Sequence, residues 1–319
     1  MIDFICVKET PWGQLGKQIE NQTDKSEYIV EQMEQSFTVA ADPMKTDLLG
    51  LIPSYHAVYR TDNTRLLSVI NHYPNLVQNS EMFNAVDYLL LSEATFECGG
   101  AIGNGQQVFG IIKLKDAYKV DSDIDNYVIL INDHSKSDGK ITIINALIHL
   151  PSMCMLQYAM PNRRYCYRIP STDDISTNRN LGGAIFENAQ TCVKLTSKYL
   201  NGLKQIAIDD SMHFSLMDSM FPYQTNAEGD MLDNSANENV TIRRELFTDC
   251  LNESHLAEYS GTAYQYYFAM LDFTQHYFSN VNHAYDLTKR MCNVPGIGQS
   301  PEAAQVNKLL KLINKQSSL

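Results

Sequence analysis

The residues with the clearest chemical pattern are three arginines interleaved with two tyrosines: Arg163, Arg164, Tyr165, Tyr167 and Arg168. Guanidinium groups pair with phosphate oxygens, and tyrosine rings stack on nucleic-acid bases. On a β-strand, side chains alternate between two faces, so this spacing brings like side chains into register on one face. The pattern predicts a surface that grips the backbone of single-stranded DNA. A solvated edge strand with buried tyrosines is the alternative that the sequence leaves open.

Charge distribution narrows where such a surface can lie. The 319-residue chain has a formal net charge of −12, so its surface as a whole repels phosphate. Residues 160–204, however, contain seven basic and three acidic residues, whereas residues 206–242 contain seven acidic residues and no lysine or arginine. Lys194 and Lys198 belong to the basic stretch, and we add them to the predicted nucleic-acid-binding set.

One stretch imitates the start of a calcium-binding loop. Asp121, Asp123 and Asp125 alternate as in an EF-hand. Position six is Asn126, where the loop needs glycine, and position twelve is Asn132, where it needs a bidentate glutamate. We interpret the stretch as a solvated acidic loop between strands.

Spacing motifs for catalysis are absent from the sequence. The eight histidines form no HExxH pattern, no GxSxG elbow occurs, and the glycines between Gly99 and Gly105 lack the GK[ST] ending of a phosphate-binding loop. The seven cysteines form no CxxC pair and are predicted to be reduced, mostly buried residues. A nucleophile at Cys154 or Cys166 would have no local base beside it. We expect no enzyme, no cofactor and no metal ligands, while a site assembled from distant residues stays open.

Sequence periodicity outlines the elements that must position these residues. Residues 65–78 are expected to form a strand that runs into a turn at Pro74, and Asn79 or Ser80 could cap the helix that follows. Glycine-rich residues 98–114 indicate a β-hairpin, and residues 127–150 indicate a second one. Together they predict an antiparallel meander.

Helices are predicted mainly in the second half of the chain. Apolar residues in 185–206 have the spacing of an amphipathic helix, and further helices are expected in 262–281 and 302–316. The predicted fold class is therefore α+β, an antiparallel β meander packed by helices, with a mostly helical C-terminal region. We expect three parts: an α+β core with an N-terminal arm (1–217), an acidic exposed loop (218–241) and a helical region that packs on the core (242–319).

The compartment follows from what the sequence lacks. No stretch approaches the roughly 18 consecutive apolar residues of a membrane helix. Acidic and basic residues occupy the start, where a signal peptide has its apolar run. We expect a cytoplasmic protein without a membrane partner, located in the host cytoplasm if a phage encodes it.

The first half of the chain shares a pattern of motifs with one known family. Pro11, Trp12 and Gly16 resemble the opening PWH-x-LG, and residues 66–83 are similar to the element LG-V-x-x-x-Y-x-x-V-Q-N-x-E-x-F. These motifs are those of the phage- and plasmid-like protein family that is catalogued as a domain of unknown function.

Later segments extend the resemblance over nearly the whole chain. Residues 98–114 and 127–140 look like the family's next two blocks, and residues 261–277 resemble its TA-x-x-x-x-NA-x-x-x-x-x-x-H helix, with His276 at the histidine. The family's R-V-V-C-x-N-T motif is matched only at Cys154, because the preceding arginine and the following asparagine are absent.

The resemblance implies a mobile-element context with no assigned activity. The order of strand, helix, meander and long helix is also similar to the core of phage single-strand annealing proteins, which assemble as rings or filaments and lay single strands along a basic groove. By this fold-level analogy we expect a non-catalytic protein, a homo-oligomer, that binds and anneals single-stranded DNA in phage or plasmid recombination or replication.

A protein–protein interaction module of a mobile element is the alternative. Its acidic residues and aromatic C-terminal helix would contact a host or phage protein, and it would act as a virion-associated, regulatory or counter-defence factor. The negative net charge favours this alternative.

Overall fold

The chain divides into two units, and each is built from segments distant in sequence. Unit 1 comprises residues 1–147, 162–193 and 284–294, and unit 2 comprises residues 148–161, 194–283 and 295–319. The boundary falls within the strand β9 (Lys140–His149) and within the helix α3 (Arg179–Lys204). The computed structural model describes residues 4–6, 17–18, 31, 37–48, 50–72, 75–91, 94–115, 120–136, 139–152, 154–156, 166–170, 179–277 and 301–316.

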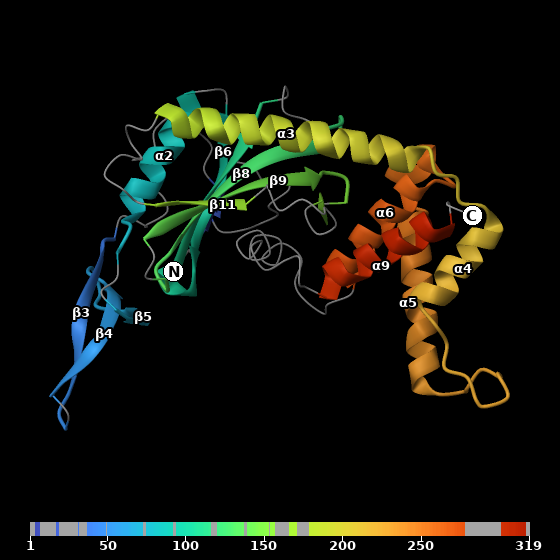
Figure 1. The fold of residues 1–319 in the computed structure, drawn as a ribbon, viewed down its shortest axis with the longest axis horizontal. Helices are drawn as coiled ribbons and strands as arrows, with labels where there is room; N and C mark the ends of the chain where they lie inside the picture. The colour runs from blue at the N-terminus through green and yellow to red at the C-terminus, as the bar shows by residue number, and fades with distance from the viewer. Residues whose placement is uncertain are drawn as a thin grey trace. The chain divides into compact units, whose positions relative to one another are not determined.

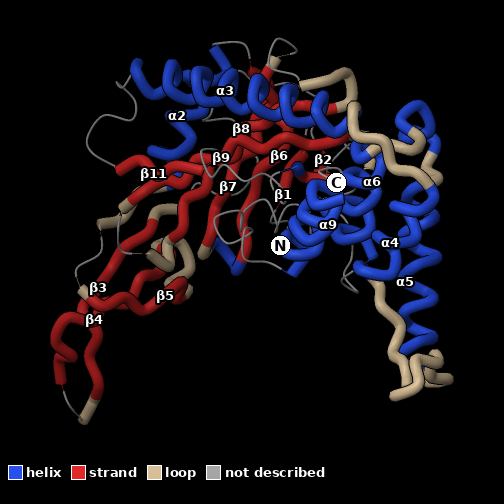
Figure 2. Tube along the Cα trace, turned by 45° about the vertical axis from the view of Figure 1, so that its right-hand side comes forward, coloured by secondary structure: helices blue, strands red, loops and turns tan. Residues whose placement is uncertain are grey.

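The main sheet of unit 1 is the predicted meander (Figures 1 and 2). Its central strands, β6 (Ala94–Ile102), β7 (Gln107–Leu114), β8 (Ile124–Asp133) and β9, are neighbours in sequence and in the sheet. The sheet continues beyond β6 with β1 (Phe4–Cys6) and β2 (Lys17–Gln18), and β11 (Cys166–Pro170) pairs with β9. The α+β prediction is therefore confirmed.

Both predicted hairpins are present, and glycines permit their turns. Gly103, Asn104 and Gly105 connect β6 to β7 with positive φ angles of 64°, 62° and 102°. Gly139, with φ 58°, precedes β9, and a Cβ atom there would lie 2.6 Å from the Asn75 side chain. An L side chain at Gly139 would therefore be strained and would also collide.

Helix α2 (Asn79–Leu91) packs on β6, β7 and β8, as the predicted strand-to-helix order requires. Met82 and Phe83 are fully buried there. All ten residues of β8 are buried, both its central apolar run 127–131 and the polar residues Asp125, Asn126, Asn132 and Asp133 at its ends. Burial of one such large apolar side chain contributes about 1.5–3 kcal/mol.

The solvated acidic loop predicted around Asp121, Asp123 and Asp125 is present only in part, because Asp123 is an exposed turn residue whereas Asp125 is not. Asp125 lies inside β8 with no exposed surface, and its carboxylate pairs with Lys113 on the neighbouring strand β7. Asp121 and Ile124 form an isolated bridge at the turn. The prediction was wrong for Asp125 because a lysine across the sheet compensates the buried charge, and only strand register reveals that pairing.

A second, three-stranded sheet in unit 1 consists of β3 (Val39–Thr46), β4 (Gly50–Arg60) and β5 (Leu66–Asn71), in that order. Arg60, the last residue of β4, contacts two other segments. Its guanidinium lies 3.8 Å from the Phe37 ring centroid and donates a hydrogen bond of 3.2 Å to the Asn104 carbonyl oxygen.

Unit 2 is mostly helical, which confirms the predicted C-terminal region. Its helices are α4 (Asp210–Met220), α5 (Ser235–Leu251), η5 (Ser254–Tyr259), α6 (Ala263–Asp272), the π-helix η6 (Phe273–Tyr277) and α9 (Pro301–Gln316). Asp209 and Asn234 cap α4 and α5 by accepting backbone N–H bonds. Phe221, Phe247 and Phe273 form the aromatic core between these helices, with ring centroids 5.4–6.1 Å apart.

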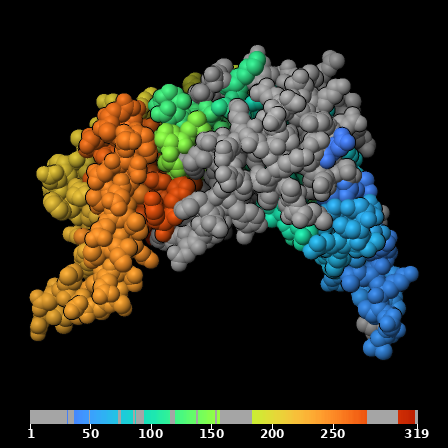
Figure 3. Space-filling model, turned by 180° about the vertical axis from the view of Figure 1, so that it is seen from behind, coloured from blue at the N-terminus to red at the C-terminus, as the bar shows by residue number. Residues whose placement is uncertain are grey.

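The acidic segment is only partly a loop. Helix α4 ends at Met220 and α5 begins at Ser235, so the irregular part of the predicted 218–241 loop is residues 221–234. Residues 224–233 are all exposed, and this segment forms the orange tip of unit 2 at the lower left of Figure 3. Among the described helices, none combines the length and apolar character needed to cross a membrane.

Candidate functional site

The predicted nucleic-acid-binding residues are distributed over three segments. Arg163, Arg164 and Tyr165 lie outside the described residues. Tyr167 and Arg168 lie on β11, where their backbones pair with Ile143 and Thr142 of β9. The strand predicted from the alternating arginines and tyrosines is therefore present for its second half.

Lys194 and Lys198, the remaining predicted residues, occupy one face of α3. They are four residues apart, so their side chains lie one helical turn apart, and both are exposed. Neither has an ion-pair partner among the residues that the structure describes. Helix α3 contains four basic residues and a single acidic one, Glu187, in a chain of net charge −12.

Lys204, at the end of the same helix, is engaged within unit 2. Its ammonium group lies 4.6 Å from the Tyr259 ring centroid and 4.8 Å from that of Tyr264, and it donates a hydrogen bond of 3.4 Å to the Tyr259 hydroxyl. These aromatic contacts hold the ammonium group inward. The exposed cations near the C-terminal end of α3 are thus Lys194 and Lys198.

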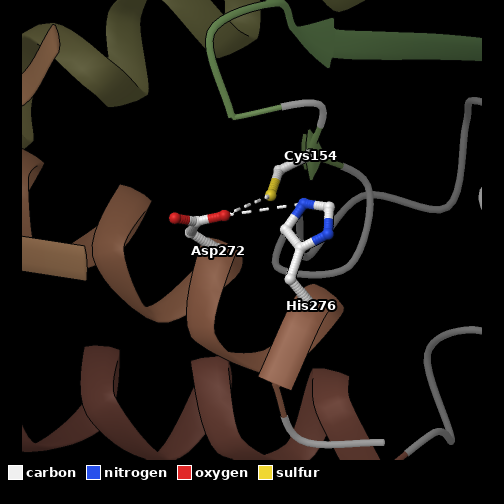
Figure 4. A group of neighbouring side chains, drawn as sticks. All are labelled: Cys154, Asp272 and His276. Atoms are coloured by element: carbon white, nitrogen blue, oxygen red, sulfur yellow. Dashed lines mark hydrogen bonds and ion pairs between the residues drawn. The ribbon is translucent and has the colours of Figure 1, made fainter. Parts of the chain in front are cut away.

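A second group of chemically capable side chains lies elsewhere in unit 2. Cys154, Asp272 and His276 each offer a donor atom, and the three atoms all lie within 4.8 Å of one another. Asp272 interacts with both of the other residues (Figure 4): its Oδ1 is 3.9 Å from Cys154 Sγ and 3.5 Å from His276 Nε2. We refer to these three residues as the Cys–Asp–His centre.

Helix geometry places two of the three residues. Asp272 is the last residue of α6 and His276 lies four residues later in the π-helix η6, so both project from the same face. The Thr274 hydroxyl donates to the carbonyl oxygens of Met270 and Leu271, at 2.7 and 3.1 Å, within this altered turn. Single π-helical turns inside α-helices frequently occur at functional sites.

Cys154 reaches the centre from β10 (Cys154–Met155), which pairs with the last residues of β9. The Gln275 side chain fastens this short strand to η6: its Nε2 donates to the Met155 carbonyl oxygen at 3.1 Å, and its Oε1 accepts from the Met155 N–H at 3.0 Å. The Tyr267 hydroxyl donates a further bond of 3.4 Å to the Leu156 carbonyl oxygen. The Gln275 side-chain amide therefore makes the two backbone hydrogen bonds to Met155 that a neighbouring strand would make.

The Ser152 carbonyl oxygen connects the thiol and the imidazole. It accepts a hydrogen bond of 2.7 Å from His276 Nε2 and lies 3.3 Å from Cys154 Sγ. The Ser152 hydroxyl in turn is 2.6 Å from His149 Nδ1. The turn between β9 and β10 is thus held by the same side chains that form the centre.

Burial shapes the electrostatics of the centre. It raises the pKa of Asp272 to about 6, although the Cys250 thiol, which is hydrogen-bonded to this carboxylate, and the nearby His255 act in the opposite direction. Burial, followed by the charge of Asp272, raises the pKa of the Cys250 thiol. The pKa values of Asp272 and Cys250 are raised for the same reason: burial removes the water that would stabilise a negative charge on either group.

The cysteine prediction holds where the structure tests it, but the centre itself was missed. Cys98, Cys154 and Cys250 are buried free thiols, as predicted. Cys154 and Asp272 are 118 residues apart, and no sequence spacing connects them. The local sequence signal for the centre was the i,i+4 spacing of Asp272 and His276, but this spacing is too common in helices to identify a site.

Comparison with known proteins gives a family and no function. A family model described as Domain of unknown function (DUF932) matches residues 66–293, which include α3 and the Cys–Asp–His centre. Neither a curated protein nor a solved structure matches the chain.

Proposed function

The chain belongs to the DUF932 family, a domain of unknown function, and we propose that it binds single-stranded DNA without catalysing a reaction, in recombination or replication of a phage or plasmid. The observation that carries this proposal is that Lys194 and Lys198 on the basic helix α3 are exposed and have no ion-pair partner within the described part of the chain.

An exposed lysine pair suits backbone binding for a physical reason. An acidic protein repels nucleic acid at long range, so attraction must come from a limited surface where cations are not already neutralised. Lys194 and Lys198 meet this condition, whereas Arg244 is paired with Asp218 at 2.8 Å and Lys136 with Asp133 at 2.7 Å. We assign phosphate contacts to Lys194, Lys198, Arg163, Arg164 and Arg168.

We propose a preference for single-stranded over duplex DNA because the predicted nucleic-acid-binding residues include two tyrosines. Tyr167 lies on β11 beside Arg168, and Tyr165 precedes it in sequence. Unpaired bases offer their faces to such rings, and stacking contributes about 1–3 kcal/mol per base regardless of sequence. Bases inside a duplex are already stacked, so this contribution requires a single strand.

The test is fluorescence anisotropy of labelled poly-dT, with a duplex of the same length as the control ligand. We expect saturable binding that prefers the single strand and weakens steeply with salt. Annealing of complementary oligonucleotides should then be measured with the same protein. Absence of poly-dT binding at low salt would contradict the proposed function.

Charge reversal locates the contact surface. Lys194→Glu combined with Lys198→Glu should reduce poly-dT affinity at least tenfold, because two attractive contacts become repulsive. Lys311→Glu is the matched control, since Lys311 is also an exposed helical lysine but lies on α9. Arg163→Glu with Arg164→Glu tests the strand segment in the same assay.

A protein partner is the second candidate, and one observation favours it. Within the exposed residues 224–233, Asn226 accepts backbone N–H bonds from Glu228 and Asp230 at 3.0 and 2.8 Å, so the acidic tip has a defined turn. Such a tip would suit a basic protein surface. Replacing Glu228, Asp230 and Asp233 with Asn or Gln should abolish capture of a host or phage partner, and unchanged capture would count against this candidate.

A further inference from the structure

We propose that Cys154, Asp272 and His276 form a binding site for a divalent transition-metal ion of the zinc class. The proposed site shares no residue with the proposed DNA contacts and does not depend on them. Four features of the molecule support a metal site: the spacing of the donor atoms, their chemistry, an unsatisfied polar atom on a residue that interacts with Asp272, and the rigidity of the frame.

The spacing of the donor atoms fits tetrahedral coordination. Zinc binds cysteine sulfur at about 2.3 Å and imidazole nitrogen or carboxylate oxygen at about 2.0–2.2 Å, so neighbouring ligand atoms lie roughly 3.3–3.8 Å apart. In this structure the Asp272 Oδ1 to His276 Nε2 distance is 3.5 Å and the Asp272 Oδ1 to Cys154 Sγ distance is 3.9 Å. Two of the three pairs thus stand at or near the required separation.

Donor chemistry selects the class of metal. Calcium and magnesium take all-oxygen ligand sets, and one carboxylate among a thiol and an imidazole does not provide one. A mixture of sulfur, nitrogen and oxygen suits zinc, and also cobalt, which is a useful probe of the same geometry. Three protein ligands leave the fourth tetrahedral position to water.

The surroundings contain a polar atom that the described protein groups do not satisfy. His255 Nε2 is buried and has no hydrogen-bond partner among the described residues, and His255 interacts electrostatically with Asp272. Its ring lies 5.1 Å from that of His149. Buried polar atoms normally have a partner, so this unsatisfied nitrogen, on a residue that acts electrostatically on the half-buried Asp272, points to a missing ligand or ion-bound water.

The frame is fixed independently of any metal. Gln275 and Tyr267 hold the backbone of 154–156, while α6 and η6 hold Asp272 and His276. The side chains of His276 and Asp272 are 21% and 14% exposed, which gives an ion access from the His276 side. Coordination would require the Cys154 thiol to lose its proton and His276 Nε2 to release the Ser152 carbonyl oxygen. Cys250 would remain an outer group that orients Asp272.

The test is titration of the chelator-stripped, reduced full-length protein with Co²⁺, followed by displacement with Zn²⁺. We expect one cobalt ion per chain, visible d–d bands of tetrahedral intensity, and a near-ultraviolet thiolate-to-cobalt band that zinc removes. A folded, reduced protein that takes up neither ion would overturn the proposal.

Variants assign the ligands. Cys154→Ser should abolish the thiolate band, and Asp272→Asn or His276→Gln should weaken cobalt binding by about 100-fold or more, beyond the 10–100-fold loss typical of outer-shell changes. Cys192→Ser, which changes a half-buried cysteine of unit 1, should bind like the wild type. Circular dichroism verifies that each variant folds, and the isosteric Asp272→Asn keeps the test decisive if Cys154→Ser does not fold. Wild-type spectra and affinity in folded Asp272→Asn or Cys154→Ser would overturn the assignment.

Discussion

The lysine pair on α3, Lys194 and Lys198, and the Cys–Asp–His centre differ in how they present polar groups. The two lysines are exposed and have no described carboxylate partner, so solvent and salt set the strength of any contact they make. The centre is largely buried and its groups contact one another, so desolvation and fixed geometry set its strength. The first arrangement suits a long, charged, sequence-tolerant ligand, and the second suits a small ion.

The frame of the centre should give the largest effect when it is broken. Gln275→Ala leaves the buried N–H and carbonyl groups of Met155 without their partners. Each unsatisfied group costs about 1–3 kcal/mol, so for the two groups we expect roughly 2–6 kcal/mol of lost unfolding free energy in urea titrations. The exposed control Gln190→Ala should stay within about 0.5 kcal/mol of the wild type. A similarly small effect of Gln275→Ala would mean that the clamp does not hold β10.

Metal should stabilise the protein through the centre alone. Zinc at 100 times its dissociation constant should add about 2.7 kcal/mol to the unfolding free energy, provided that the unfolded chain does not bind it. A chelator should reverse the gain, and Asp272→Asn should not show it. The measurement is urea unfolding with and without zinc. Equal stabilisation of Asp272→Asn would place the ion elsewhere.

Cys250 separates an orienting role from a ligand role. Because its thiol is hydrogen-bonded to Asp272, Cys250→Ala should weaken cobalt affinity about 10–100-fold, whereas Cys250→Ser retains a donor and should lose less. The thiolate-to-cobalt band should keep its intensity in both variants. A band that drops by about half in either variant would make Cys250 a direct ligand and refute the orienting role.

A change in salt concentration, the mildest perturbation, should affect ligand binding at Lys194 and Lys198 more than metal binding at the Cys–Asp–His centre. Raising the ionic strength from about 50 to 200 mM weakens contacts between exposed cations and phosphate, but it screens buried groups far less. Poly-dT affinity should therefore fall while cobalt affinity changes less than about twofold. Parallel losses of both affinities would show that the centre is as accessible to solvent as the lysines.

Local signals predicted most of the fold. Gly103 and Gly139 marked turns that need positive φ, and the apolar spacing after Ile185 predicted the helix that became α3. Groups paired across the sheet could not be predicted, because the burial of Asp125 against Lys113 depends on strand register. The unit boundary was hidden for a related reason, since β9 and α3 run through it without a break in pattern.

The functional residues divide in the same way. Lys194 and Lys198 are neighbours on a helix, so sequence alone could pair them. Cys154 reaches Asp272 from a two-residue strand that Gln275, next to His276, and the end of β9 hold by hydrogen bonds. Contacts of that kind arise from tertiary packing, which periodicity does not encode.

The most direct test of the proposed function is the salt dependence of poly-dT binding for the wild type and for Lys194→Gln combined with Lys198→Gln. For single strands, log K falls by about 0.7 per phosphate contact for each tenfold rise in salt. Loss of two contacts should therefore reduce the slope by about 1.4, with the Lys311→Gln control unchanged. Equal slopes and affinities for wild type and double variant would contradict the assignment of DNA binding to α3.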